Sequence, residues 1–376
     1  MTLPTKQHHI VHIIDHMGLG GAQRVVADLA IRQMHSGRSV SIICLRGPTP
    51  LSTELANQGI RLYYISCHRW SLRQFDLIAN LLRNLAPSLV HLHLLRAQTI
   101  GRAAAVVAGV HSLVVHDHDS SAEIYSHPGP ILVFRRLIEP YVPPCRIVYI
   151  VLTEEAREYA INIRRLQCEK LVVIPNGVDI DYIDQCKLHK TEARRTLNIA
   201  QNYPLIVTAG RLNITKGFDV LIEAMTILPP HIHLAIAGDG PERANLLAQI
   251  VASGLQSRIR LLGQLDDIRP LLRASDLYVQ PSRREPFGLA AAEAAALGLP
   301  VVASAVGGLR HVVRHELTGL LVPPDHPRLL ADAILTLTND TTRANVMGAT
   351  GRQYIQETFD ISLIADQIDQ VYASLL

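Results

Sequence analysis

Short runs of Val, Ile and Leu alternate with amphipathic segments along the chain, and this alternation constrains the fold more than any other feature. In the first half, the strand-like runs are His9–Asp15, Ser39–Leu45, Arg61–Ser66, Leu89–His93, Leu113–His116, Ile147–Leu152 and Leu171–Ile174. Helical patterns lie between them at Gly21–Met34, Leu72–Leu85 and Glu154–Arg165. Because strand, helix and strand follow one another repeatedly, we expect right-handed crossovers and a parallel sheet.

The same alternation restarts after the turn at Pro175–Asp179. The strands expected there are Leu205–Ala209, His233–Ala237, Arg260–Gly263, Leu277–Gln280, Val301–Ala303 and Gly319–Val322. The helices expected there are Gly217–Ile227, Pro241–Ser253, Ile268–Ala274, Phe287–Leu297 and Arg328–Thr338. A chain of 376 residues is long enough for two domains that each bury a core. We therefore predict an α/β protein with two Rossmann-like, doubly wound domains.

The predicted domains are residues 1–180 and 181–352, and residues 353–376 form a helical tail that packs on a domain. In doubly wound sheets, ligands bind beyond the carboxyl ends of the strands. With two such domains, the expected site is the cleft between them.

Composition and cysteine usage favour a soluble protein of a reducing compartment. The five cysteines are scattered and form no CxxC pair. The N-terminus lacks the apolar core of a signal peptide. No stretch reaches the roughly 18 uncharged apolar residues that a membrane span needs. We expect a cytoplasmic location.

Two glutamates mark the start of an alanine-rich helix in the second domain. Glu285 precedes the helix, and Glu293 lies about two turns inside it. The N–H groups of Phe287, Gly288 and Leu289 are expected between them, at a helix end that attracts anions. These amides could bind phosphate, and the two carboxylates could accept hydrogen bonds from sugar hydroxyls. A nucleotide-sugar requires both kinds of contact.

Three glycine-containing turns follow strands. Gly210-Arg211 and Lys216-Gly217 place two cations beyond the first strand of the second domain, where a diphosphate could bind. Gly238–Pro241, which contains Gly240, is a weaker signal because such turns are common. For both, an ordinary solvated turn is the alternative.

The third turn, in the first domain, contains Gly18, Gly20 and Gly21. Its spacing differs from a dinucleotide fingerprint, because Gln23 stands where the third glycine would be. No acidic residue closes the second strand either. We expect the backbone amides of this turn to approach a diphosphate closely. The alternative is a tight turn with no ligand.

Histidines crowd the predicted strand ends of the first domain. For His116, which ends a strand and precedes Asp117, we expect contact with a sugar hydroxyl rather than with a metal. For His91 and His93 we expect core or capping roles.

In this order and spacing, the motifs resemble family 4 retaining glycosyltransferases of the GT-B fold over nearly the whole chain. The residues that carry the resemblance are Gly20–Arg24, His116-Asp117, Pro175–Asp179, Gly210-Arg211, Lys216-Gly217, Gly238–Pro241, Glu285 with Glu293, Gly298–Pro300 and Gly307-Gly308. Pro286 replaces a glycine that is usual in the family, and His311 stands where the family often has glutamate.

The resemblance implies a role for each matching position. Arg211 and Lys216 would neutralise the donor diphosphate, and Gly210 and Gly240 would help to form its site. The amides of Phe287, Gly288 and Leu289 would hold the phosphates, and Glu293 the ribose. Glu285 and His116 would contact the transferred sugar. Gly20 and Gly21 would approach the diphosphate from the first domain, onto which the last helix would cross back.

The expected partners are a UDP-, GDP- or ADP-linked sugar and a glycan or glycolipid acceptor, with no cofactor, metal or nucleic acid. The resemblance favours a bacterial polysaccharide or glycolipid pathway. A catalytically silent nucleotide-sugar-binding scaffold is the main alternative, and a sugar-nucleotide epimerase or a phosphorylase is a third.

The charge of the first 150 residues points to a further partner. They hold 14 Lys and Arg against 8 Asp and Glu. Trp70, with Arg69 and Arg73 beside it, could mark an edge that meets an anionic membrane. Peripheral association with the inner face of the plasma membrane is therefore a further hypothesis, with a solvated basic face as its alternative.

Overall fold

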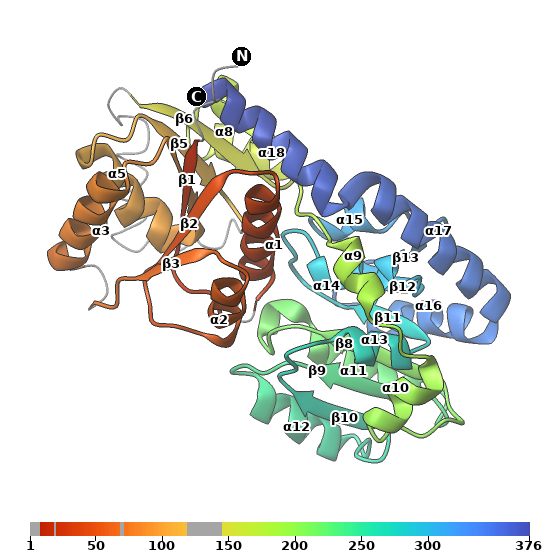
Figure 1. Cartoon of the computed structure of the whole chain (residues 1–376). Coiled ribbons are helices and arrows are strands. Elements are labelled where there is room, and N and C mark those ends of the chain that lie inside the picture. The colour runs from red at the N-terminus through yellow and green to blue at the C-terminus, as the bar shows by residue number, and fades with distance from the viewer. Residues whose placement is uncertain (1–7, 19, 68–70, 119–144) are drawn as a thin grey trace. The chain divides into compact units, whose positions relative to one another are not determined.

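The chain forms two compact α/β units in a computed structural model that describes residues 8–18, 20–67, 71–118 and 145–376 (Figure 1). The first unit comprises Met1–Gly177 and Ile361–Leu376, and the second comprises Val178–Asp360. The two units are described separately.

The described part of the first unit contains a sheet of seven parallel strands in the order β3-β2-β1-β4-β5-β6-β7. Their bounds are β1 His9–Ile14, β2 Ser39–Cys44, β3 Arg61–Tyr64, β4 Leu89–His93, β5 Ser112–His116, β6 Arg146–Val151 and β7 Leu171–Val173. The order reverses between β1 and β4, which are hydrogen-bonded neighbours. Strands β4 and β5 are buried at every position because helices cover both faces.

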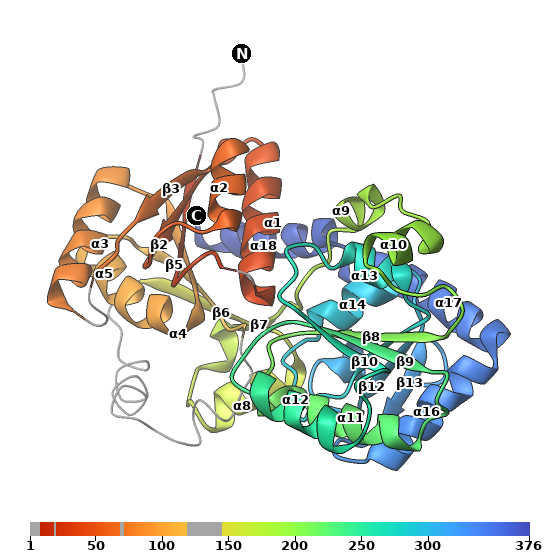
Figure 2. The ribbon, with the colours of Figure 1, turned by 90° about the horizontal axis from the view of Figure 1, so that it is seen from below.

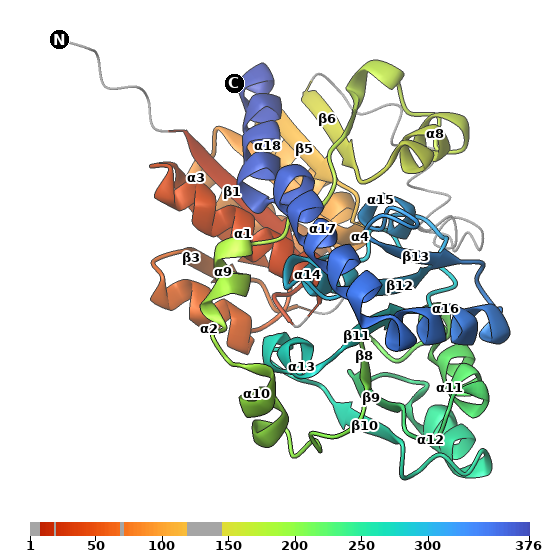
Figure 3. The ribbon, with the colours of Figure 1, turned by 90° about the vertical axis from the view of Figure 1, so that its right-hand side faces the viewer.

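The helices of the first unit form two layers. They are α1 Gly21–His35, α2 Pro50–Asn57, α3 Leu72–Leu85, α4 Leu94–Arg96, α5 Arg102–Val107, α8 Glu154–Asn162 and α18 Ile361–Leu375, with π-helical η1 Ala97–Gly101 and 3₁₀-helical η3 Cys168–Lys170. Helices α1, α2 and α18 contribute to the cores on one face of the sheet, and α3, α5 and α8 contribute to the core on the other. Figure 3 shows α18 running along β5 beside α1.

The second unit contains a sheet of six parallel strands in the order β10-β9-β8-β11-β12-β13. Their bounds are β8 Leu205–Ala209, β9 His233–Ala237, β10 Ile259–Gly263, β11 Leu277–Gln280, β12 Val301–Ser304 and β13 Gly319–Val322. Its helices are α9 Ile180–Gln185, α10 Lys190–Thr196, α11 Phe218–Ile227, α12 Arg243–Ala252, α13 Arg269–Ala274, α14 Leu289–Ala296, α15 Leu309–Val312, α16 Pro327–Asn339 and α17 Thr341–Phe359, with 3₁₀-helical η4 Ile214–Lys216.

A large apolar core lies on one face of this second sheet. It joins the inward side chains of α11, α12 and α16 to those of the strands. Helix α14 belongs to the other layer, where it contacts α17 and α9 (Figure 2). Helices on both faces of a parallel sheet are the arrangement that the repeated strand–helix pattern predicts, so the predicted fold class is confirmed.

The C-terminal segment differs from the single tail that we expected from residue 353. Gln353 lies inside α17, which ends at Phe359, and a new helix, α18, begins at Ile361. Asp360 between them is extended, with φ −58° and ψ 134°. The apolar spacing continues across this break, so periodicity alone did not reveal it. Among the described helices, none has the length and hydropathy needed to cross a bilayer.

The loops at the carboxyl edge of the second sheet interlock so closely that several positions admit only glycine, as two of them illustrate. Gly217, between η4 and α11, has φ +65°, and a Cβ there would lie 2.1 Å from the carbonyl oxygen of Pro281. Gly308, after β12, would place a Cβ 2.3 Å from Cα of Phe287. The loops that follow β8, β11 and β12 are thus in direct backbone contact.

Replacing Ile368 by Ala should destabilise the first unit by about 2–5 kcal/mol, because this α18 side chain is fully buried against Ile10 and Val114. Leu363→Ala is the matched control on the same helix, since Leu363 is 42% exposed. Chemical denaturation followed by circular dichroism measures both. Equal effects would show that α18 is not anchored through this face.

Replacing Gly217 by Ala should lower the melting temperature of the second unit by more than Gly254→Ala does. Both glycines have nearly the same positive φ, +65° and +68°, but nothing lies within 4 Å of a Cβ at Gly254. The control therefore measures the backbone strain alone, about 1–2 kcal/mol, and the difference measures the clash with Pro281. Equal melting temperatures would contradict the interlocked loops.

Candidate functional site

The strand order of the second sheet reverses between β8 and β11. Helix α11 follows β8 and packs into the core on one face, whereas α14 follows β11 and belongs to the other layer. The connections at 210–217 and 281–288 nevertheless meet at the carboxyl edge of the sheet, where the N–H of Arg283 donates to the carbonyl of Thr215 over 2.8 Å. Such a reversal is where doubly wound sheets bind ligands.

Lys216 and Glu285 meet at this reversal. Lys216 Nζ lies 2.6 Å from Glu285 Oε2, and the side chains are 22% and 8% exposed. Ser282 donates from its hydroxyl to the same carboxylate oxygen over 3.1 Å. The cation and the carboxylate, to which the resemblance gave separate roles, form one ion pair. A partly shielded pair of this kind is held by charge and by a second hydrogen bond.

A buried polar chain fixes the position of Glu285. Tyr278 donates from its hydroxyl to Gln280 Oε1 over 2.7 Å, and Gln280 Nε2 donates to Ser282 Oγ over 2.9 Å. Burial raises the pKa of Tyr278 well above its usual value, so its hydroxyl stays a donor. The carboxylate is thereby tied to β11 by side chains as well as by backbone.

Arg283 is a site residue that sequence reasoning missed. Its guanidinium donates to both carboxylate oxygens of Asp219, over 2.8 and 2.6 Å, and to Asp325 over 2.6 Å. The hydrogen bonds to Asp219 are the main reason that the pKa of Arg283 lies above its usual value. Arg283 also donates to the carbonyl of Ile214 over 2.7 Å, so it clamps the Lys216 loop onto the Glu285 loop. In the sequence, only its position two residues before Glu285 could have pointed to this role.

Arg211 and the two turn glycines lie on neighbouring strand ends. Gly210 donates from its N–H to Ala237 over 3.0 Å, and Leu212 donates to Asp239 over 2.9 Å, so the turns after β8 and β9 adjoin. Gly240 donates to the side chain of Asp239 over 2.8 Å. Arg211 is exposed. Its guanidinium makes no hydrogen bond or ion pair with the rest of the described chain, which leaves it free for an anion.

Helix α14 begins two residues later than the sequence predicted. Gly288 is its N-cap, with φ +98°, and Leu289 is the first helical residue. Glu293 consequently lies little more than one turn inside the helix, rather than two. Phe287 is 2% exposed, and its ring meets Phe359 edge-on at 5.3 Å. Because first-turn N–H groups have no intrahelical acceptor, this end can bind an anion.

In the first unit, Gly20 and Gly21 lie at the start of α1, beyond the carboxyl end of β1. Both are exposed, Gly20 is extended, and the first turn of α1 carries no acidic residue. This helix end can also accept an anion. Their predicted part in donor binding stays a prediction, as does that of His116.

His116 is fully buried rather than presented at a surface. It belongs to a group of five buried histidines with His12, His91, His93 and His118 (the histidine cluster). Burial lowers the pKa of His12 and of His118 to about 4, and it lowers the pKa of the other three well below the usual value. The expected core role of His91 and His93 is confirmed. In this conformation, His116 lies in the core with them.

The second unit thus gathers an exposed arginine, a lysine–glutamate pair and a helix N-terminus at one edge. Cations and first-turn amides attract a polyanion, and a carboxylate beside them accepts hydrogen bonds from hydroxyls. The chemistry fits a ligand that joins phosphates to a sugar.

Two family profiles together match most of the chain. The profile described as "Glycosyltransferase Family 4" matches residues 19–182, and "Glycosyl transferases group 1" matches residues 189–354. A D-inositol 3-phosphate glycosyltransferase of Xylanimonas cellulosilytica is 33% identical over 54% of this chain, and the match spans 51% of that protein.

Two further relatives match over nearly the full length. A UDP-Gal:alpha-D-GlcNAc-diphosphoundecaprenol alpha-1,3-galactosyltransferase of Escherichia coli is 28% identical over 95% of both chains. The crystal structure of HepE from Anabaena with UDP and glucose superposes with a TM-score of 0.86, at 25% identity, over 98% of this chain and 100% of that one.

The topology of both units, the residues at the carboxyl edge of the second sheet and these comparisons agree. The chain belongs to glycosyltransferase family 4, with the GT-B fold.

Proposed function

We propose that the protein is a retaining glycosyltransferase that moves a sugar from a nucleotide-diphospho-sugar to an acceptor hydroxyl. One observation carries the proposal: Arg211, the Lys216–Glu285 pair and the first turn of α14 lie at the reversal of strand order in the second unit. We place the diphosphate between these cations and the α14 amides. Glu293 then serves the ribose hydroxyls and Glu285 the transferred sugar.

The reaction leaves a nucleoside diphosphate, so negative charge develops on its outer phosphate. Arg211, Lys216 and the α14 N-terminus are the groups that would stabilise this charge, without a metal ion at the phosphates. Retention would follow from attack of the acceptor hydroxyl on the face from which the diphosphate departs. In that path, the leaving phosphate oxygen takes the hydroxyl proton, and no protein nucleophile is needed.

The comparisons support a UDP-linked donor and a lipid-linked acceptor as the first choice. HepE has been crystallised with UDP-glucose at 25% identity to this chain. The relative from Escherichia coli is named for transfer from UDP-Gal to a sugar on diphosphoundecaprenol. A role in bacterial envelope glycolipid or polysaccharide synthesis is the corresponding setting. Relatives matched over about half their own length support the reaction class rather than the substrate.

Removing Arg211 or Lys216 should abolish transfer while the fold is retained. We expect Arg211→Ala and Lys216→Ala each to lower kcat by roughly 10²–10³, since each removes a group that faces developing charge. Arg328→Ala is the control, an exposed arginine on α16 outside the site. Product formation from UDP-, GDP- and ADP-sugars is measured with a lipid-linked acceptor, and circular dichroism verifies folding.

Donor binding and turnover, measured together, separate the enzyme from a silent scaffold. Calorimetry should show that one nucleotide-sugar series binds the wild type and that Lys216→Ala weakens binding, with EDTA making no difference. Wild-type turnover in the double variant Arg211→Ala/Lys216→Ala would refute the assigned site. Binding without turnover, for every acceptor tried, would favour the scaffold.

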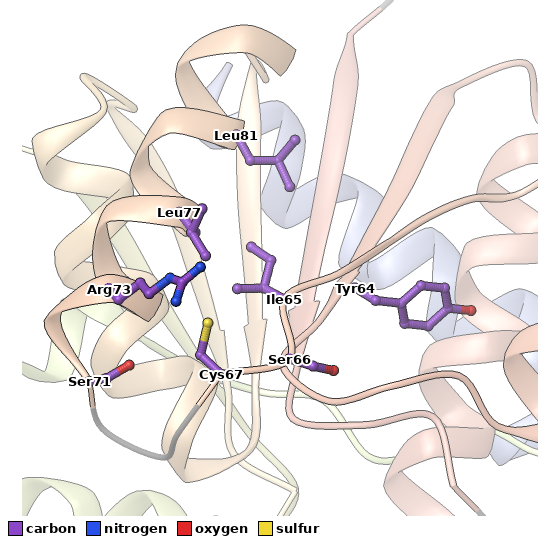
Figure 4. Close-up of a pocket in the computed structure, with 8 residues that line it drawn as sticks. All are labelled: Tyr64, Ile65, Ser66, Cys67, Ser71, Arg73, Leu77 and Leu81. Carbon is purple, nitrogen blue, oxygen red and sulfur yellow. The ribbon is translucent and has the colours of Figure 1, made fainter.

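A surface pocket in the first unit supports contact with a lipid. It has a volume of about 610 Å³ and is formed by the loop after β3 and by helix α3 (Figure 4). Its lining includes Ile65, Leu77 and Leu81 together with Arg73. Leu72, next to it, is 83% exposed. Exposed apolar side chains beside a cation are what an anionic bilayer binds. Arg69 and Trp70, on which the hypothesis also rested, lie outside the described residues.

Acidic substitutions in this region should weaken binding to anionic vesicles. We expect Leu72→Asp and Arg73→Glu each to reduce flotation with phosphatidylglycerol vesicles several-fold at low salt, and high salt to reduce wild-type binding. Leu329→Asp, at a 44% exposed leucine of the second unit, is the control. Equal flotation of all variants, or none of the wild type, would exclude this surface.

A further inference from the structure

The histidine cluster lies on one face of the first sheet and has no part in the proposed phosphate site. Along β1, β4 and β5, the side chains toward α1 and α18 are apolar at the amino ends, where Ile10, Leu89 and Val114 lie. Two residues further along each strand, the same face carries His12, His91 and His116, and β4 adds His93. The register pairs His12 with His91 and His93 with His116, so the rings are adjacent.

Hydrogen bonds join three of the imidazoles into a chain. Gln33 Oε1 accepts from His12 Nε2 over 2.8 Å. His12 Nδ1 then lies 2.9 Å from His93 Nε2, and His93 Nδ1 lies 2.9 Å from His118 Nε2. His91 Nδ1 is 2.6 Å from the Tyr372 hydroxyl of α18.

The chain leaves several buried polar atoms without a hydrogen-bond partner among the described residues. They are His91 Nε2 and both ring nitrogens of His116. An unpaired buried polar group costs about 1–3 kcal/mol. Several in one place indicate that a partner belongs there, and an ion or ordered water is the usual one.

We propose that His93, His116 and His118 bind one late first-row divalent cation, with Zn²⁺ as the biological candidate. One ring nitrogen from each residue lies within 4.8 Å of the other two, and all three residues are buried. The site goes beyond the proposed function, because the diphosphate is assigned to cations of the second unit.

The ligand set selects the metal. It consists of imidazoles, which suit zinc, copper and nickel, whereas magnesium and calcium require mostly oxygen ligands. Each imidazole coordinates a metal through the lone pair of one ring nitrogen. Asn176 forms a side-chain hydrogen bond with His118 and would help to orient its ring.

The geometry needs only a small adjustment. Tetrahedral zinc with bonds of about 2.0–2.1 Å separates two nitrogen ligands by about 3.3 Å. His93 Nδ1 and His118 Nε2, at 2.9 Å, would have to move apart by about 0.4 Å if these two atoms are the ligands. His116 gives up no hydrogen bond. His93 keeps its Nε2 contact to His12, which would orient it as outer partners orient metal-bound histidines.

A second group of three, His12, His91 and His93, also has its nitrogens within 4.8 Å of one another. Both ring nitrogens of His12 are already engaged, and one of His91 is held by Tyr372. Coordination there would break more hydrogen bonds and would leave both ring nitrogens of His116 without a partner among the described residues. The group with His116 and His118 is therefore favoured.

Metal binding by the purified full-length protein tests the proposal. After removal of bound metal with a chelator, one equivalent of Zn²⁺ should bind at neutral pH in calorimetry and raise the melting temperature. Co²⁺ should give the intense visible absorption of a four-coordinate site. Elemental analysis of protein that was never exposed to chelator should show zinc. If the wild type binds neither ion at micromolar concentration, the proposal is wrong and water fills the cluster.

Variants assign the ligands. His116→Ala and His118→Ala should each weaken Zn²⁺ binding at least tenfold, with His116→Gln and His118→Gln as less disruptive substitutions and circular dichroism as the folding check. His315→Ala, on the surface of the second unit, should bind like the wild type. His91→Gln should retain binding. Loss in His91→Gln, with retention in His118→Ala and His118→Gln, would move the site to the other group and overturn this assignment.

Discussion

The reversal of strand order between β8 and β11 is the constraint on which the candidate site depends. Helices α11 and α14 leave their strands toward opposite faces, so the loops that precede them meet only at the carboxyl edge of the sheet. Side chains hold the two loops together there, because Arg283 ties one loop to the other and Lys216 meets Glu285 across them. A parallel sheet with single-sided connections would offer no such place for a polar ligand.

Most of the fold could be predicted from the sequence because buried parallel strands leave a strong local signal. Each described strand coincides with an expected hydrophobic run, within one or two residues at its ends. Helix ends were harder, because they depend on single backbone conformations. Gly288 takes φ +98° and delays α14 to Leu289, and the extended Asp360 divides α17 from α18 within one continuous apolar pattern.

The sequence indicated which residues belong to the candidate site, but it did not indicate how these residues contact one another. The types and spacing of Arg211, Lys216, Glu285 and Glu293 led to the prediction of a phosphate and sugar site, yet the ion pair between Lys216 and Glu285 requires the register of β8 against β11. The histidine cluster was hidden for the same reason. His12 and His118 are far apart in sequence. Only the pairing of β1 with β4 and of β4 with β5 brings the histidines of these strands together.

The lysine–glutamate pair also bears on how a donor would be accommodated. At 2.6 Å and with Glu285 8% exposed, the pair satisfies both charges before any ligand arrives. A phosphate that approaches Lys216 competes with that carboxylate for the same ammonium protons. If the ammonium turns toward phosphate, Glu285 keeps the Ser282 hydroxyl and gains an accepting lone pair for a sugar hydroxyl. Phosphate binding and sugar binding would then be coupled through one ion pair, so that neither half of the donor is held fully without the other.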